Sequence, residues 1–478
     1  MPASVIGAGR MTDPTFPPDG TIVRLNTHTR RTGGRVLVGG APIRVSRISA
    51  VAAERLPGRD LAVGDETSRA LARYLLETGM GELLSASLPD VPLGMLTVVI
   101  PVRDRPTPLA RLLASVPAGV AEVVVVDDGS VRPQAVARVV AEQGARLVKL
   151  PENRGPAAAR NAGMSTAQTP YVAFVDSDVV LDEGALQTLL RHLIDPDVAL
   201  VAPGVRGLRR ERGTWLERYE DARSSLDLGP DASTVRPRSR VSWVSSTCLV
   251  ARVSALGGGF DADLRVGEDV DLVWRLVAAG HRVTYDPTAI VRHEHRASLV
   301  AWMRRKFDYG TGAYGLGVRH PQDIAPVALP PWSIALLTVT LAQRPWSVPV
   351  GVGIVAAFAA RISRRISHIP NRRRLAALLA AQGTVTTLVQ GSALLVRHWW
   401  PLTIVLALGS KRVRRAALVA ALGDAAIEYV RLRPRLDPVR FTLARRLDDV
   451  AYGAGVWWSS IRGRSAAALK PRVVRGNE

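Results

Sequence analysis

Acidic residues that stand directly after apolar runs are the first candidates for chemistry. Asp176 and Asp178 follow the run YVAFV and are separated by Ser177. Two carboxylates on one turn can share a divalent cation, and Mg²⁺ or Mn²⁺ accepts such oxygen ligands and bridges to phosphate groups. An Asp-x-Asp pair is common and often consists only of solvated acids. The prediction of a metal site therefore depends on the position of this pair at the end of a buried strand.

Two further polar clusters follow neighbouring apolar runs. Asp128 and Gly129 come after VVVV, and Pro101 and Arg103 end the earlier run LTVVI. The Asp128 carboxylate can accept a hydrogen bond from a base or a ribose hydroxyl, and Gly129 permits a tight turn. Each cluster alone is typical of a turn with solvated charges. Three such clusters at adjacent strand ends predict one crevice that binds a nucleotide and its phosphates.

Arginines between these clusters could meet the phosphates. Arg154 precedes Gly155, and Arg160 follows in the same segment. Arginine engages phosphate with two parallel hydrogen bonds, and a helix that begins at Gly155 would also favour an anion. A capped helix with solvated arginines is an equally good interpretation of either residue.

The segment GEDVDL opens a helix with three acids, Glu268, Asp269 and Asp271. Acids at a helix start are often only partners of the helix dipole. The functional interpretation makes Asp269 a general base for an acceptor hydroxyl, with Glu268 and Asp271 on the acceptor side. Of two histidines further on, His293 could complete the metal site.

The elements that must position these residues alternate regularly from residue 96. Apolar runs near residues 96, 123, 146 and 171 predict strands, and the segments between them predict helices. This βαβαβαβ order predicts an open α/β sheet, in which ligands bind beyond the carboxyl ends of the strands.

The flanking segments differ from this pattern. We expect a disordered tail over residues 1–20 and a small winged-helix-like module over 21–90, with a hairpin at Gly33-Gly34. The α/β domain covers 95–317, a hydrophobic helical region covers 330–423, and a basic tail covers 424–478. The chain of 478 residues is 47% hydrophobic and has one cysteine, so a folded protein without internal disulfides is predicted.

Residues 95–317 resemble the family-2 glycosyltransferases of the GT-A fold. The resemblance rests on IPVRDR, VVVVDDGS, NRGPAAARN, FVDSDV and GEDVDL, in the family's order and spacing. It implies that Asp128 binds the nucleoside and that Asp176 and Asp178 bind the diphosphate through Mn²⁺ or Mg²⁺. It also implies that Asp269 is the base of an inverting transfer, and that His293 is a metal ligand. The Q-x-x-R-W motif of processive relatives does not follow.

The chain as a whole is similar to the mycofactocin-system glycosyltransferases of actinobacteria. The stretch LNTHTRRTGGRVLVGGAPIRVSRIS, ahead of the transferase core, carries this closer resemblance. It implies a peptide-derived mycofactocin precursor as acceptor and UDP-glucose as donor, with the glucose added singly or as a short β-linked chain. The N-terminal module would then recognise the acceptor.

Two alternatives remain at the level of sequence. One is a membrane glycosyltransferase that acts on a polyprenyl-phosphate-linked or cell-wall glycan. The other is a basic nucleic-acid-binding protein, which would explain the net charge of +21. Carboxylates at three strand ends would repel phosphates in the absence of a metal, so we expect no nucleic acid partner.

The apolar region after residue 330 predicts contact with a membrane. Residues 375–396 carry no charge and are long enough to span a hydrocarbon core of ~30 Å, whereas 347–360 are too few. Basic clusters flank both sides, at 361–374 and 411–415. A single span cannot keep both clusters in the cytoplasm, but a re-entrant hairpin or interfacial helices can. We therefore expect association with an anionic surface, the cytoplasmic face of the plasma membrane; a buried helical bundle is the alternative.

Overall fold

The computed structural model describes residues 16–208, 213–367, 369 and 371–474. It contains two compact units. The first unit comprises Met1–Arg209 and Ser224–His295, and the second comprises Arg210–Arg223 and Arg296–Glu478. The predicted tail over residues 1–20 lies largely outside the described residues. Its last part is ordered, because Phe16 is buried and the Gly20 amide donates to the Val63 carbonyl.

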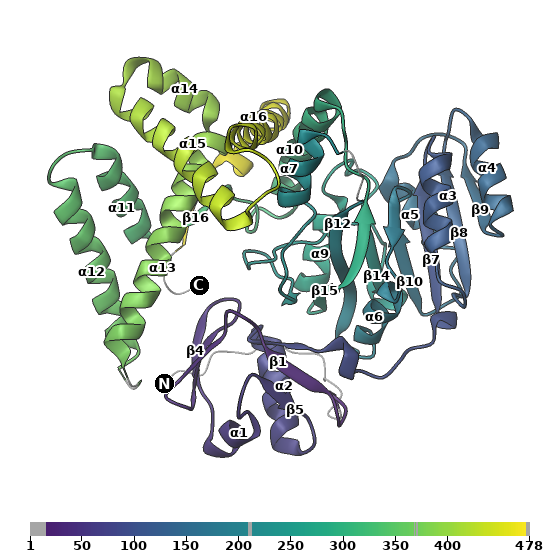
Figure 1. Cartoon of the computed structure of the whole chain (residues 1–478), viewed down its shortest axis with the longest axis horizontal. Coiled ribbons are helices and arrows are strands. Elements are labelled where there is room, and N and C mark those ends of the chain that lie inside the picture. Colours follow the sequence, from purple (N-terminus) through teal and green to yellow (C-terminus); the bar gives the residue numbers. More distant parts are fainter. Residues whose placement is uncertain (1–15, 209–212, 368, 370, 475–478) are drawn as a thin grey trace. The chain divides into compact units, whose positions relative to one another are not determined.

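A large mixed sheet forms the body of the first unit (Figure 1). Its strand order is β11-β15-β12-β14-β10-β7-β8-β9, with β13 (Ser233–Thr234) paired to β15. The bounds are β7 Leu96–Val102, β8 Glu122–Asp128, β9 Arg146–Leu150, β10 Tyr171–Val175, β11 Val179–Leu181, β12 Val198–Gly207, β14 Cys248–Arg252 and β15 Arg282–His293. Strands β10, β7, β8 and β9 are parallel, which confirms the βαβαβαβ order predicted from residue 96.

Helices connect these strands and begin where the sequence favours a first helical turn. They are α3 Pro106–Ser115, α4 Pro133–Glu142, α5 Pro156–Met164, α6 Ala185–His192, α8 Val253–Leu256 and α9 Glu268–Ala278. Helices α3, α4 and α5 each start with proline, whose missing N–H costs nothing at that position. All seven residues of β7 are buried, as a strand covered on both faces requires. The strand ends therefore project from a rigid core.

The N-terminal module of the first unit is built from short elements. They are β1 Ile22–Leu25, β2 Arg30–Thr32, β3 Val36–Gly39, β4 Arg44–Arg47, α1 Ala50–Arg55, β5 Asp60–Ala62, α2 Glu66–Thr78 and β6 Gly81–Leu83. The expected Gly-Gly hairpin joins β2 to β3 in the sheet β2-β3-β4. Strand β1, which precedes the hairpin, does not join it, because β1 pairs with β5 and β6 in a second sheet.

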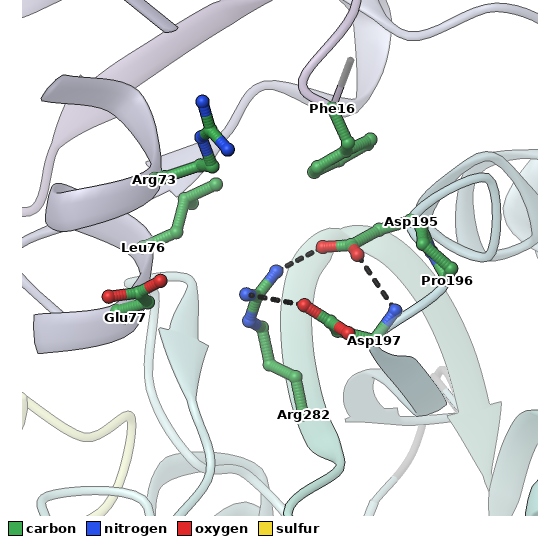
Figure 2. A pocket seen from close by; sticks show the side chains of 8 residues that line it. All are labelled: Phe16, Arg73, Leu76, Glu77, Asp195, Pro196, Asp197 and Arg282. Carbon is green, nitrogen blue, oxygen red and sulfur yellow. Dashed lines mark hydrogen bonds and ion pairs between the residues drawn. The ribbon is translucent and has the colours of Figure 1, made fainter. Parts of the chain in front are cut away.

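This module rests on the α/β domain rather than hanging from a linker. Ile194 of the α/β domain packs against the module's apolar core. Figure 2 shows the contact around Arg282, which pairs with Asp195 and lies 3.7 Å from Asp197. The cavity there measures about 10 Å³, which is room for one water at most and too little for a substrate.

The second unit is helical. Its helices are α7 Trp215–Arg223, α10 Leu299–Arg319, α11 Pro331–Ala342, α12 Ser347–Arg365, α13 Arg372–Ala393, α14 Trp400–Gly409, α15 Lys411–Leu432 and α16 Pro438–Arg462, with a π-helical turn at Leu394–His398 and short strands β16 Ala328–Leu329 and β17 Arg472–Val473. Helices α10 and α16 pack closely because glycines meet at their contact: a Cβ on Gly310 would lie 3.0 Å from the Gly455 Cα.

Several charged residues of the second unit are buried. Asp448 and Asp449 on α16 are buried; Arg397 contacts both, and Arg445 lies 2.5 Å from Asp449. The surrounding cations hold the pKa of Asp448 down to about 2, although burial opposes its ionisation. The acids are thus paired, as buried charges must be.

Three expectations for the C-terminal half need correction. The predicted basic tail 424–478 contains the end of α15 and the whole of α16, whose inward face is buried. Helix α10, expected to end the α/β domain, belongs to the second unit because it packs along α16. The segment judged too short to span continues as helix through Arg365, so α12 has 19 residues.

Candidate functional site

The loops after β7 and β8 are fastened to each other. The Asp104 amide donates to the Ser130 hydroxyl at 2.9 Å, and the Asp104 carboxylate accepts from the Val131 amide at 2.8 Å. Arg103, predicted to bind the donor, is half-exposed, whereas Pro101 is buried in β7 opposite Val126. Two of the predicted polar clusters therefore form one rigid rim.

Asp128 ends β8 and holds the next loop in place. Its two carboxylate oxygens accept from the amides of Arg154 and Gly155 at 2.7 and 2.9 Å, and the residue is 5% exposed. Gly129 has φ 65°, and a Cβ there would come within 2.5 Å of the Asn153 amide nitrogen. Only glycine fits this close approach. Arg154, in contrast, is exposed at the surface.

Arg160 joins two of the predicted acidic motifs. Its guanidinium lies 2.6 Å from the Asp176 carboxylate and 3.0 Å from that of Glu268, and its side chain is 3% exposed. Burial opposes the charged form, but Asp176 and Glu268 keep the pKa of Arg160 above its ordinary value. The turn after β10 and the start of α9 are therefore parts of one site.

Asp178 faces a different set of basic side chains. Arg105 pairs with one carboxylate oxygen, and Nε2 of His293 lies 3.6 Å from the other. His293 reaches this place because β15 pairs with β11, where it stands opposite Val179. Burial raises the pKa of Asp178, but the charges of His293 and Arg105 outweigh it and hold the pKa below the usual range. The carboxylate is therefore ionised at neutral pH.

Asp269 lies at the start of α9, against the loop before β14. Its carboxylate accepts from the amides of Ser246 at 3.2 Å and Val270 at 2.8 Å. Burial and the charge of Glu268 raise the pKa of Asp269 to about 7, against the opposing effect of these hydrogen bonds. A carboxylate with such a pKa can accept a proton near neutral pH. Asp271 points elsewhere: it is buried and lies 2.7 Å from Arg275.

The donor types present suit a hard cation. Among the described residues no group of three or more His, Cys, Asp or Glu side chains is already arranged around one point. Asp178 and His293 are nevertheless adjacent, and Asp176, two residues away, is 28% exposed. Carboxylates are the ligands that Mg²⁺ and Mn²⁺ prefer. The side chains present are therefore of the types that bind such a cation. In this arrangement Arg105 neutralises the charge of Asp178.

Two contributors were not selected from the sequence. Arg105, the partner of Asp178, lies in the motif IPVRDR, where nothing in the sequence distinguishes it from its neighbours. The Ser246 amide, which holds Asp269, gives no side-chain signal; only the small polar run Ser245-Ser246-Thr247 before a buried strand marks the place.

The chain is similar in sequence to known glycosyltransferases. The family model described as "Glycosyl transferase family 2" matches residues 97–252. A pre-mycofactocin glycosyltransferase of Mycobacterium tuberculosis is 39% identical over 95% of this chain and 98% of its own length. The succinoglycan biosynthesis protein ExoU of Rhizobium meliloti is 30% identical over 39% of this chain and 57% of its own.

Solved structures give a weaker likeness. A mannosyltransferase of Pyrobaculum calidifontis, in complex with GDP-Man and Mn²⁺, is 19% identical with a TM-score of 0.42, covering 78% of this chain and 90% of its own. The sequence relative that matches nearly end to end carries the assignment of family.

Proposed function

Because the chain belongs to the family of pre-mycofactocin glycosyltransferases, within glycosyltransferase family 2 and its GT-A fold, we propose that it transfers a hexose from a UDP-sugar to a peptide-derived mycofactocin precursor. The donor we propose is UDP-glucose, and the product carries one glucose or a short β-linked chain. The observation that carries the proposal is the placement of Arg160 between Asp176 and Glu268. It supports the proposal because an acid proposed for the donor side and an acid proposed for the acceptor side contact the same guanidinium.

Asp269 is the proposed base. Its carboxylate would take the proton of the acceptor hydroxyl while the hydroxyl oxygen forms its bond to the anomeric carbon. The bond from that carbon to the UDP oxygen breaks on the opposite face, so the configuration inverts and UDP leaves. A pKa of about 7 suits this role, since the group is partly ionised at neutral pH and can still hold a proton.

The residues on the donor side bind and orient. Asp128 would contact the nucleoside, although its carboxylate oxygens already hold the loop at Arg154 and Gly155. Asp176, Asp178 and His293 would hold Mn²⁺ or Mg²⁺, which neutralises negative charge on the departing diphosphate. Arg103 and Arg154 would meet the phosphates from the exposed rim. For Arg160 burial favours a positioning role, because its guanidinium is engaged by two carboxylates.

The test is product formation by the purified full chain. With UDP-glucose, a mycofactocin precursor and Mn²⁺ or Mg²⁺, we expect a hexosylated product by mass spectrometry with a β-anomeric signal by NMR. Asp263→Asn serves as a matched control, because Asp263 is an exposed acid on the loop before α9. An α-anomeric product would contradict the inverting mechanism, and transfer only to polyprenyl-linked glycans would support the other acceptor class.

The proposed location is the cytoplasmic face of the plasma membrane, where nucleotide sugars are available. Two helices, Ser347–Arg365 and the helical segment Arg372–His398, are long and apolar enough to cross a membrane, and little of either is buried. Fractionation with a salt wash followed by detergent tests the attachment. Recovery of the full chain in the soluble fraction would contradict it.

A further inference from the structure

The second unit contains a long stretch without acidic residues. From residue 324 to residue 423 there is no Asp or Glu, although the same stretch has twelve Lys and Arg residues. Six of these arginines flank the connection between α12 and α13 and are called the arginine turn here: Arg361, Arg364, Arg365, Arg372, Arg373 and Arg374. A stretch of this composition has no acidic residue of its own to balance these arginines, which favours an anionic partner.

The helices that carry the arginine turn expose apolar side chains. Val348 and Val352 on α12 are 72% and 64% exposed, and Val385 on α13 is 61% exposed. Leu408 on α14 and Val419 on α15 are also largely exposed. Apolar faces with basic ends are typical of helices that lie against anionic lipid.

A cavity lies within the arginine turn itself. It measures about 540 Å³ and is lined by Ser363, Arg364, Ser367, Arg372, Arg373 and three alanines. No carboxylate contributes to this lining, and Arg372 donates to the Ser367 carbonyl at 3.2 Å. Guanidinium and hydroxyl donors around an open space of this size suit a phosphate group.

Charge argues against a hairpin that crosses the bilayer. Helix α12 is long enough to cross, but only the sixteen residues between Arg344 and Arg361 are uncharged, and they extend ~24 Å as helix. A crossing of the ~30 Å hydrocarbon core would therefore bring arginines of its last turns into the core. A crossing hairpin would also place all six arginines of the turn on the side away from the cytoplasm, against the preference for cytoplasmic positive charge.

We propose that the arginine turn binds the phosphate headgroups of anionic phospholipids, and that α12 and α13 enter one leaflet without crossing the membrane. The arginine turn then lies on the same side of the membrane as the transferase domain. This inference rests on the membrane association proposed above but not on the sugar transferred, so each can fail separately.

The first test locates the arginine turn. Cys248 is buried, so single cysteines introduced at exposed polar residues report accessibility. Asn371→Cys marks the turn at a position outside the lining of the cavity, and Ser165→Cys marks the transferase domain. A membrane-impermeant maleimide should label both in inside-out vesicles and neither in intact spheroplasts. Labelling of the two cysteines from opposite sides would overturn the inference, and so would a full chain that stays soluble.

The second test measures how strongly the arginine turn binds anionic lipid. Full chain in detergent is mixed with vesicles of phosphatidylcholine alone or with phosphatidylglycerol. The variant Arg364→Gln/Arg372→Gln/Arg373→Gln should bind phosphatidylglycerol vesicles ~100-fold more weakly and phosphatidylcholine vesicles unchanged, from the usual attraction per cation at a lipid surface. Hexose transfer in detergent should be unaffected.

The matched control neutralises the basic cluster at residues 411–415 with the variant Lys411→Gln/Arg412→Gln/Arg415→Gln. This variant should lose less affinity for phosphatidylglycerol vesicles, since the cavity lies in the arginine turn. If both variants lost the same affinity for phosphatidylglycerol vesicles, the attraction would be diffuse. That result would contradict a specific lipid site in the cavity. Release of the wild-type chain by inorganic phosphate at constant ionic strength would assign the cavity to free phosphate instead of lipid.

Discussion

Glu268→Gln should move the acid side of the pH profile of transfer. Asp269 must be ionised to act as a base, so kcat/KM should rise with pH through about 7 in the wild-type protein. After burial, the charge of Glu268 is the largest cause of that raised pKa. The substitution removes this charge and leaves Arg160, now relieved of one carboxylate partner, to attract Asp269 more strongly.

Both effects lower the pKa of Asp269. The acid limb should therefore move to lower pH by about one unit, a typical result for one neighbouring charge. The assay is kcat/KM for the acceptor between pH 5 and 9 at saturating donor and metal, with Asp263→Asn as a surface control. An acid limb that stays in place, or moves to higher pH, would refute the assignment of Asp269 and Glu268.

Substitutions at three further positions test the rest of the site. Asp178→Asn should lower kcat by ~10² or more with the fold intact, as for loss of a main electrostatic contact, and full activity of the wild-type in excess EDTA would remove the metal from the account. Arg160→Leu should lower the free energy of unfolding in urea by about 3 kcal/mol, because two carboxylates lose their buried partner; Arg160→Lys should recover part of it, and an unchanged urea midpoint would contradict the bridge. Gly129→Ala should raise KM for the donor and destabilise the protein, since the new Cβ would meet Asn153 and φ is positive; wild-type KM would show that the loop can shift.

The α/β domain could be predicted because its signals are local. Each buried strand is a continuous apolar run, and the carboxylates stand directly after those runs, as with Asp128 and Asp176. The parallel order then places their ends at one edge. The same reasoning could not find the partners. Arg160 and Glu268 are 108 residues apart, and no pattern in either segment indicates the other.

The second unit was harder to predict because charged residues in its helices do not mark the exposed positions. Helix α16 buries Asp448, Asp449 and Arg445, so its sequence resembles that of a solvated tail. Their mutual pairing, with Arg397 from the turn after α13, makes the burial possible. Helix α7 joins this unit from the middle of the α/β domain, which only the folded chain reveals.

Hexose transfer by Asp269→Asn in a single turnover tests the central claim most directly. The full-length variant, loaded with UDP-glucose and Mn²⁺ or Mg²⁺, is mixed with precursor, and the product is followed by mass spectrometry beside Asp263→Asn. We predict that donor affinity is retained and that product formation falls by ~10² or more, since the base acts only on the acceptor. Transfer at the wild-type rate would contradict the account of the site.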